Sequence, residues 1–528
     1  MEEQNDPTKN IVIVGGGSSG WMTASILIKF FPEKNITLIE DPEQGVIGVG
    51  ESTYDGIRYF CGLLEIDDRD FFSYTDASIK LGLRLSNFHN NHSSDSYIYP
   101  FGPPNTDGTL WGLDDWQVKK HFFPETPSEQ YAESYFPAAI MCKYNRINDN
   151  FDYLLDKFNI LYHTALHFDA VKFGQWLKNK YSMPKGVKCL QDKVVKCEMN
   201  NDGSIKNLYL KSGVLIEADL FIDCSGFSSL LLSNYMKEPF NDYTNLLPNN
   251  KAWATRIPYK DKEKEMRNVT TSTAIENGWC WDIPLWSRLG AGYVYSDKFI
   301  DDEQALLEFK NYLMSNKIVC PRNKIEIDDL EFKNIKMRVG IHERVWVKNV
   351  VAIGLAAGFI EPLESNGLFT VHDFLYQLCH VLSRKSKITE WDRESFNTAT
   401  KKIYNTFVEF IRLHYALSSR TDTRYWEYLS QQEWGIGNSK FHLLQAHESR
   451  TTPLPASQSG GLNWISSGMS YSSLDAISIR LGEMYNRFDY KTELKKYWDN
   501  LENRRIKWES EILNSLTTMQ YIENKYHS

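Results

Sequence analysis

The sequence predicts an α/β fold with a Rossmann-type sheet, a second sheet, and a mostly helical C-terminal region. An apolar strand runs into a glycine-rich turn near the N-terminus, two later strands also end at glycine turns, and the last third has helical periodicity. We expect residues 1–370 to form the nucleotide-binding module, with substrate-side insertions at about 85–150 and 250–330. Residues 371–528 would then form a mostly helical substrate-binding subdomain.

The composition of the chain argues against several protein classes. Its net charge of -9 disfavours nucleic-acid binding, because no basic stripe offsets the charge. The 8 cysteines are scattered without a Cys-x-x-Cys pair, so we expect neither a metal site nor a disulfide framework. The acidic N-terminus does not resemble a signal peptide, and no apolar run is long enough to span a membrane. These features predict a cytoplasmic protein without a membrane partner.

The first glycine-rich turn has the spacing of a dinucleotide-binding site. It follows the strand at residues 11–14 and consists of Gly15, Gly16, Gly17, Ser18, Ser19 and Gly20. In this motif Gly15 permits a tight turn, Gly17 lets the backbone approach a pyrophosphate, and Gly20 lets helix and strand pack closely. Glu40 ends the next predicted strand, where a carboxylate can accept the ribose hydroxyls. FAD and NAD share this pattern, so it predicts an adenine dinucleotide without choosing between them.

Two distal turns favour FAD over NAD. A predicted strand at residues 218–224 ends at Ser225-Gly226, and another at 350–353 ends at Gly354. A chain with the N-terminal fingerprint and these two turns resembles the FAD-dependent monooxygenase fold, in which one flavin passes three separated segments. We expect the glycine-rich turn at residues 48–53 to line the isoalloxazine end.

The stretch from Gly354 to Phe369 combines a turn, two glutamates and the start of a helix. A helix that opens at Asn366-Gly367 would direct free backbone N–H groups into the turn, which is a natural anion site. A carboxylate, Glu364, lies two residues before this pair. An ordinary capped strand–turn–helix explains the same pattern, so both interpretations stay open from the residues alone.

Two further features have ordinary explanations as well as functional ones. Lys80 lies between Ile79 and Leu81, unusual company for a solvated lysine, but the exposed face of an alternating strand would explain it and is favoured by the pattern alone. Trp279 and Trp281 lie on one face of a predicted strand, where a core aromatic pair is the simpler explanation.

The remaining elements are assigned from periodicity and turn chemistry. We expect a helical stretch at 151–180, short strands at 187–215 around a hairpin turn, strands of a second sheet at 253–258 and 270–296, and helices beyond 369 interrupted by a loop at 451–461. Two histidines in the polar loop at 89–114 are better explained as solvated side chains than as metal ligands.

Taken together, the motifs resemble those of the flavin-dependent tryptophan halogenases over roughly residues 10–430. The matching segments are GGGSSGWMTA at 15–24, GVGEST at 48–53, SIKLGLRL at 78–85, HFDA at 167–170, GWCWDIPL at 278–285, EPLESNG at 361–367 and HYALSSRTDTRYW at 414–426. The WxWxIP pattern within GWCWDIPL is the signature of this family.

The resemblance implies an enzyme that uses FADH2 from a separate flavin reductase, together with oxygen and a halide, to halogenate a small aromatic substrate. Lys80 and Glu364 match the family's catalytic lysine and glutamate, and the backbone N–H groups of Asn366 and Gly367 match its halide site. Hypohalous acid would travel through an internal tunnel gated by Trp279, Trp281, Ile283 and Pro284. Flavin contacts are also expected from Val194, Leu355 and Leu368.

The chain departs from the family in places that affect substrate and halide. Asn366 stands where the family commonly has threonine, so we expect halide selection to differ from that of the family and to favour bromide or iodide. No amino-acid clamp is recognisable, so tryptophan, other indoles and phenols are all candidate substrates. The alternatives are a flavin-dependent monooxygenase that hydroxylates its substrate, and a non-catalytic flavin-binding protein. The sequence does not decide whether the chain forms a homo-oligomer.

Overall fold

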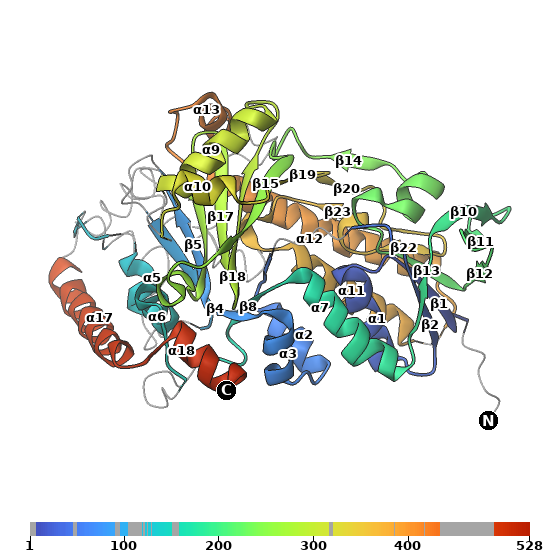
Figure 1. Cartoon of the computed structure of the whole chain (residues 1–528), viewed down its shortest axis with the longest axis horizontal. Helices are drawn as coiled ribbons and strands as arrows, with labels where there is room; N and C mark the ends of the chain where they lie inside the picture. Colours follow the sequence, from blue (N-terminus) through green and yellow to red (C-terminus); the bar gives the residue numbers. More distant parts are fainter. Residues whose placement is uncertain are drawn as a thin grey trace. The chain divides into compact units, whose positions relative to one another are not determined.

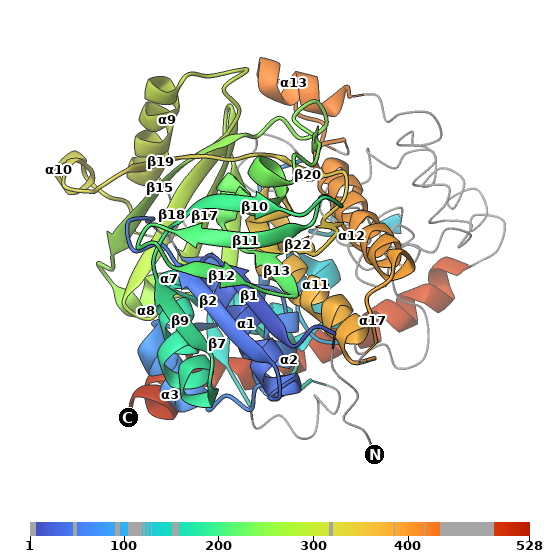
Figure 2. The same cartoon turned by 90° about the vertical axis from the view of Figure 1, so that its right-hand side faces the viewer.

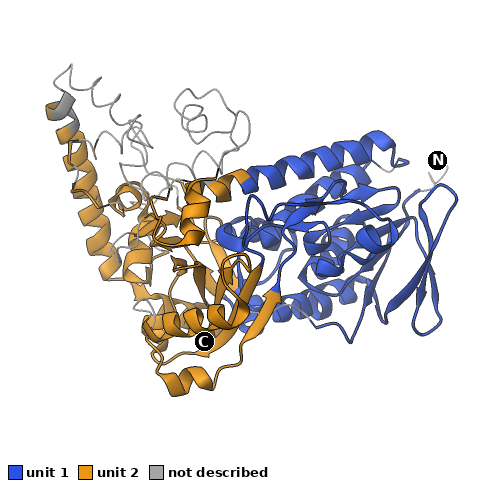
Figure 3. Cartoon of the chain, turned by 90° about the horizontal axis from the view of Figure 1, so that it is seen from above, with its two compact units in different colours: residues 1–77, 168–250, 336–408 blue, residues 78–167, 251–335, 409–528 orange. Residues whose placement is uncertain are grey.

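The structure is a computed structural model of the chain, and its parts are coloured along the sequence in Figure 1. It describes residues 7–45, 50–89, 96–103, 119, 122–123, 125–127, 129–149, 158–315, 320–384, 386–416, 418–432 and 490–528. The chain divides into two compact units, coloured in Figure 3. Unit 1 comprises residues 1–77, 168–250 and 336–408, and unit 2 comprises residues 78–167, 251–335 and 409–528.

Unit 1 contains a sheet of six strands in the order β21-β22-β13-β1-β2-β9. Its strands are β1 (Asn10–Val14), β2 (Asn35–Glu40), β9 (Lys188–Gln191), β13 (Leu220–Asp223), β21 (Trp346–Val347) and β22 (Val350–Ala352). All neighbours are parallel except β21, which runs antiparallel to β22. The helices α1 (Ser18–Phe30), α7 (Ala170–Trp176) and α11 (Gly367–Leu382) belong to the same unit (Figure 1).

The register of this sheet brings three predicted cofactor segments to one edge. Val14 pairs with Asp223, and Asp223 pairs with Ala352, so the three strands end level with one another. Because the carboxyl ends of parallel strands share an edge, the turns that follow them lie side by side. The Rossmann-type sheet predicted from the glycine turns is therefore confirmed.

Smaller elements complete unit 1. The hairpin strands β10 (Val194–Met199), β11 (Ile205–Leu210) and β12 (Leu215–Glu217) form an antiparallel sheet, visible in Figure 2. A second small sheet has the order β14-β20-β23, from Phe240–Asp242, Gly340–His342 and Gly358–Phe359. The helices α2 (Gly56–Leu63) and α3 (Asp68–Thr75) precede the first passage into unit 2, and the chain enters unit 2 for the last time within α12 (Glu390–Ala416).

Unit 2 is built on a seven-stranded sheet in the order β19-β15-β18-β17-β16-β5-β6. These strands are β5 (Gly82–Ser86), β6 (Ser96–Pro100), β15 (Lys251–Pro258), β16 (Val269–Ala274), β17 (Gly278–Pro284), β18 (Arg288–Tyr295) and β19 (Lys333–Lys336). Outside this sheet, β4 (Ser78–Lys80) pairs antiparallel with β8 (Ala165–Phe168). The strands predicted at 253–258 and 270–296 are therefore confirmed as parts of a second sheet.

The helices of unit 2 lie between these strands in the sequence and after them. They are α5 (Gln130–Tyr135), α6 (Pro137–Tyr144), α8 (Lys262–Glu265), α9 (Asp302–Ser315), α10 (Lys324–Asp328), α13 (Arg424–Ser430), α17 (Tyr490–Leu513) and α18 (Thr518–Ile522). A buried core forms under α9, where Phe309 and Leu313 pack with Cys280, Tyr293 and Tyr295 of the sheet. Within the described residues, no helix is both long and apolar enough to cross a membrane.

The compact units differ from the predicted division at residue 370. That boundary falls inside α11, and each unit is assembled from three separate stretches of chain. β4 and β8, which pair with each other, lie at the two ends of the first unit 2 stretch, residues 78–167.

The helix predicted over residues 151–180 is wrong in its middle part. Residues 165–168 form β8, and the helix α7 begins only at Ala170, after Asp169 caps it by accepting from the backbone N–H groups of Val171 and Lys172. Pairing with β4 overrides the local helical pattern there. Residues 151–157, the loop at 451–461, most of the loop at 89–114 and the first part of the turn at 48–53 lie outside the described residues.

Candidate functional site

The glycine-rich turn after β1 has the geometry that a dinucleotide requires. Gly15 has φ +121°, and a Cβ there would lie 2.2 Å from the Cys224 carbonyl oxygen. A Cβ on Gly20 would lie 1.9 Å from the Gly15 carbonyl oxygen, so the helix packs tightly on the turn. A Cβ on Gly17, in contrast, would meet no atom within 4 Å. The turn is closed at its ends and open at Gly17, where a pyrophosphate would approach.

Glu40 reaches over the same turn. A Cβ on Gly16 would lie 2.4 Å from the Glu40 Cγ atom, so the carboxylate sits directly beside the loop. Lys178 donates to this carboxylate at 2.5 Å, and its ammonium also lies 5.6 Å from the Trp21 ring. No sequence pattern indicates Lys178, because it comes from a distant segment that follows α7. It orients the carboxylate where the ribose would bind.

The second and third turns adjoin the first. Gly354 has φ +70°, and a Cβ there would lie 2.2 Å from the Ser19 hydroxyl oxygen. The buried Asp223 accepts from the Ser225 hydroxyl at 2.6 Å and from the Leu231 and Leu232 amides at 2.7 and 2.9 Å. Burial raises the pKa of Asp223, although these hydrogen bonds oppose the shift. The aspartate therefore shapes the turn and has no capacity left for a ligand.

The turn between Glu364 and Gly367 fits a small anion. Ser365 adopts a left-handed conformation with φ 56°, and α11 begins at Gly367 with Asn366 as its N-cap, as the sequence predicted. Asn366 is 2% exposed, and its Nδ2 atom has no hydrogen-bond acceptor among the described residues. A Cβ on Gly367 would meet nothing within 4 Å. An open space beside a helix N-terminus and an unused amide donor is the environment a halide needs.

The two glutamates of this turn differ in their surroundings. Glu361 is fully buried and accepts from the Asn249 amide at 3.0 Å, which marks it as structural. Glu364 is 7% exposed at the end of a short 3-10 helix. The charge of Glu364 adds to burial and Asp55 in raising the pKa of Tyr54. Both Glu364 and Tyr54 therefore belong to one partly buried cluster in unit 1.

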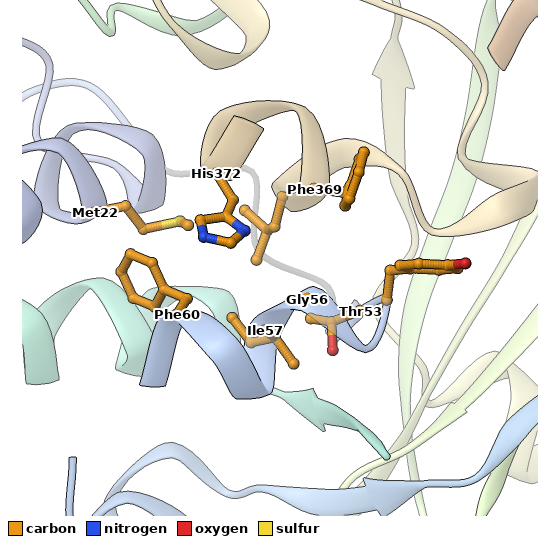
Figure 4. Close-up of a pocket in the computed structure, with 9 residues that line it drawn as sticks. Met22, Thr53, Gly56, Ile57, Phe60, Phe369 and His372 are labelled. Carbon is orange, nitrogen blue, oxygen red and sulfur yellow. The ribbon is translucent and has the colours of Figure 1, made fainter. Parts of the chain in front are cut away.

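A pocket in unit 1 collects segments that follow three of the predicted flavin motifs (Figure 4). Its lining comes from α1, from residues 53–60 and from the first turns of α11, and comprises Met22, Thr53, Tyr54, Gly56, Ile57, Phe60, Leu368, Phe369 and His372. The His372 ring meets the Phe60 ring edge-on at 6.0 Å, and burial lowers the pKa of the histidine. Leu368, a predicted flavin contact, thus lines this pocket and follows the candidate halide turn in the sequence.

Glu51 lies in the same region, and no sequence pattern distinguishes it as a functional residue. Burial raises its pKa to about 7, and the negative charge of Asp169 adds to the shift. Its position in GVGEST is the signal that the sequence offers, but the pattern alone does not show how far the carboxylate is shielded from water.

Two other predicted flavin contacts lie in different settings. Leu355 is half-buried in the 3-10 turn that follows β22, next to Gly354. Val194 begins β10 and packs in a buried cluster with Val14, Ile39 and Leu208. The cluster holds the small β10–β11–β12 sheet against the strands of the main sheet. Contact of either residue with flavin stays a prediction.

Lys80 is buried in unit 2, which contradicts the exposed-strand explanation. It is 1% exposed in β4, and its neighbours Ile79 and Leu81 are fully buried. The Lys80 ammonium lies 5.4 Å from the centre of the Phe101 ring. Since lysine is almost never fully buried unless its charge is used or compensated, this burial is what a functional lysine would show.

The predicted gating residues form one continuous stretch of β17. Trp279 and Trp281 lie on the same face with ring centres 6.2 Å apart, and the Trp281 ring covers Gly292, where a Cβ would lie 2.1 Å from it. Neither indole N–H has an acceptor among the described residues. Ile283 follows on the same face, and the Pro284 carbonyl accepts a hydrogen bond from Ser78 at 2.5 Å.

The predicted site residues thus fall into two groups. The glycine turn, Glu40, Glu364 and the Asn366-Gly367 pair belong to unit 1, while Lys80 and the tryptophan pair belong to unit 2. Joint action of Lys80 and Glu364 on one substrate stays a prediction.

Comparison with known proteins gives a consistent result. A family model described as tryptophan halogenase matches residues 10–457. A tryptophan 6-halogenase, SttH of Streptomyces toxytricini, is 33% identical over 441 residues, covering 79% of this chain and 80% of that protein. The apo structure of VirX1 superposes with a TM-score of 0.87 at 34% identity, covering 99% of this chain and 100% of that one. Tar14, a tryptophan C-6 flavin-dependent halogenase (chlorinase) from taromycin biosynthesis, has a TM-score of 0.80 at 29% identity, covering 97% and 99%.

Proposed function

Because the chain belongs to the tryptophan halogenase family, we propose that it halogenates an electron-rich aromatic substrate using FADH2, oxygen and a halide. Membership confirms the fold class and the enzyme class that the motifs predicted.

The flavin would be held by the turns at one edge of the unit 1 sheet. The open backbone at Gly17 leaves room for the pyrophosphate, and Glu40, oriented by Lys178, would face the ribose. When bound, reduced flavin supplies the reducing equivalents with which oxygen oxidises the halide to hypohalous acid. Leu355 and Leu368 would contact the ring end. A separate flavin reductase is expected to supply the reduced cofactor.

The halide would bind at the start of α11. The backbone N–H groups at Asn366 and Gly367 point along a helix axis whose N-terminus favours negative charge. The buried Nδ2 atom of Asn366 offers one more donor, which a threonine hydroxyl would place differently. A changed donor set should loosen discrimination, and bromide and iodide gain from this because they are less strongly hydrated than chloride.

Lys80 and Glu364 would carry the halogenation itself. The buried ammonium of Lys80 can hydrogen-bond hypohalous acid or form a haloamine, which holds the electrophilic halogen beside the target carbon. Glu364 would assist the lysine or accept the proton that the ring loses after the halogen adds. The tryptophan pair would keep the aromatic substrate away from the flavin, so that oxidant reaches it only as hypohalous acid.

The observation that carries this proposal is the burial of Lys80 in a chain whose flavin and halide turns have open backbone at the predicted positions. The test is incubation with FAD, NADH, a flavin reductase and chloride, bromide or iodide against a panel of indoles and phenols, analysed by mass spectrometry. We expect products that carry the added halogen and are absent without halide. A hydroxylated product formed without halide would identify a monooxygenase instead, and flavin binding with no product from any member of the panel would favour a binding protein.

A further inference from the structure

A chain of buried hydrogen bonds connects the strand of Lys80 to the end of the tryptophan strand. His167 faces Ser78 across the β4–β8 pair, and its Nδ1 atom lies 3.1 Å from the Ser78 hydroxyl. The Ser78 hydroxyl reaches the Pro284 carbonyl at 2.5 Å, and the His167 Nε2 atom lies 2.7 Å from the Thr270 hydroxyl. All of these residues belong to unit 2, and Ser78 and His167 are fully buried.

The donors and acceptors in this chain have one consistent assignment. A carbonyl oxygen only accepts, so Ser78 donates to Pro284 and its oxygen accepts from Nδ1–H of His167. The Nε2 atom then carries the lone pair and accepts from the Thr270 hydroxyl. Burial and the positive charge of Lys80 lower the pKa of His167 well below its usual value. The imidazole is therefore neutral and locked in the Nδ1–H tautomer.

The same hydrogen bonds determine the position of Lys80. Side chains two residues apart on a strand share a face, so Ser78 and Lys80 project to one side of β4. Across the pair, His167 stands opposite Ser78 and the small Ala165 stands opposite Lys80. The hydrogen bonds of His167 thus fix β4 at Ser78, two residues before Lys80. The small Ala165 leaves space for the aliphatic part of the Lys80 side chain.

We propose that His167 is a positioning residue for halogen transfer, acting through Ser78 and Thr270 to hold the Lys80 strand in fixed register with the Ile283-Pro284 end of the tryptophan strand. The proposal rests on the proposed role of Lys80. HFDA, the segment that contains His167, matched the family but had no assigned part in the site. Halogen captured by a lysine that can shift would escape before reaching the substrate, so loss of the bridge should uncouple oxidation from halogenation.

The test compares Thr270→Val with Thr270→Ser. Valine keeps the shape of threonine but removes the hydroxyl that donates to His167, whereas serine keeps the hydroxyl and loses only a methyl group. The measurements are halogenated product per flavin oxidised and hypohalous acid released to a trap such as monochlorodimedone. We expect product per flavin to fall about fivefold to tenfold in Thr270→Val, as for loss of one buried hydrogen bond. Trapped hypohalous acid should rise in parallel, while Thr270→Ser stays within about twofold of wild type.

A double variant shows whether the residues act through one chain. If Ser78→Ala and Thr270→Val both act through His167, the combined variant should be no more uncoupled than the worse single variant. Equal amounts of halogenated product per flavin oxidised in Thr270→Val and Thr270→Ser would overturn the positioning role of His167. A fall in product without a rise in trapped hypohalous acid would also overturn it. Failure of the underlying function looks different: wild type would then give no halogenated product, or Lys80→Ala would retain it.

Discussion

In unit 1 the predicted contacts to the flavin pyrophosphate and the halide are mainly backbone N–H groups, whereas the catalytic lysine predicted in unit 2 acts through a single buried side chain. At Gly17 and Gly367 a Cβ would meet nothing within 4 Å, so the unit 1 sites consist of open space bordered by N–H groups. Lys80 is instead enclosed at 1% exposure beside Phe101. The difference teaches that adding atoms should damage the backbone sites of unit 1, whereas removing atoms should damage the Lys80 site of unit 2.

Removing the lysine side chain should give the largest effect. In Lys80→Ala we expect halogenated product to fall by at least about 100-fold, the usual range for loss of a proton-transferring group. Flavin oxidation should continue, because the lysine acts after hypohalous acid forms. The measurements are product by mass spectrometry and flavin reoxidation by absorbance.

Two controls separate chemistry from packing in this experiment. Lys80→Met keeps most of the buried stem without the ammonium and should lose product as Lys80→Ala does. Lys172→Ala removes an exposed lysine and should leave activity unchanged. If flavin oxidation itself stops in Lys80→Ala, the lysine is structural or flavin-associated. The proposal that Lys80 acts only after hypohalous acid forms would then be wrong.

Adding atoms at Gly17 should have the next largest effect. A leucine side chain there would occupy the open space that the pyrophosphate needs, so we expect flavin affinity to fall beyond detection in a fluorescence titration. Gly62 is an exposed position in α2 that also has no atom within 4 Å of an added Cβ, which makes Gly62→Leu the matched control. Unchanged flavin affinity in Gly17→Leu would show that the flavin pyrophosphate does not bind at the Gly17 backbone.

The same contrast explains how far the sequence could predict the molecule. The glycine turns depend on local backbone conformation, so spacing alone located Gly15, Gly17 and Gly20 and the helix start at Gly367. The burial of Lys80 depends on pairing between β4 and β8, whose contacting residues Ser78 and His167 are separated by 89 positions. No local pattern reports such a pairing, and the pattern favoured an exposed lysine.

The residues that assist the predicted groups were missed for the same reason. Lys178 reaches Glu40 from 138 positions away, and His167 was assigned to a helical stretch although it lies in β8. The family resemblance identified which side chains matter, but the residues that orient them became visible only once distant segments were placed together.

A change in the halide turn should have a smaller, graded effect. Asn366→Thr replaces the buried amide donor with a hydroxyl and restores the residue common in the family, so we expect preference to move towards chloride by about threefold to tenfold. Flavin affinity should not change, since the backbone donors remain. Competition assays with mixed chloride, bromide and iodide would measure the product ratios. Identical ratios in wild type and Asn366→Thr would mean that the backbone alone sets halide choice.

The smallest effect is expected at Glu51, a side chain of unit 1 that tests whether the backbone sites depend on nearby charge. Its pKa is raised to about 7 from 4.5, mainly by burial and further by Asp169. Between these two values the folded protein binds a proton that the unfolded chain has lost, so the ionised carboxylate lowers stability as pH rises towards 7 and the penalty is complete above it.

Replacing the carboxylate with an amide isolates this penalty. Glu51→Gln should therefore raise the free energy of unfolding relative to wild type by about 1 kcal/mol above pH 7, less than the full shift because the side chain is partly exposed. The difference should vanish below about pH 4.5, where wild type is protonated in both states. Urea unfolding of both proteins at pH 4.5, 6 and 8 measures it, with Glu217→Gln, at an exposed position of β12 in the same unit, as the control. A stability difference that does not change with pH would show that Glu51 is not held protonated, leaving the flavin-side turns independent of titrating side chains.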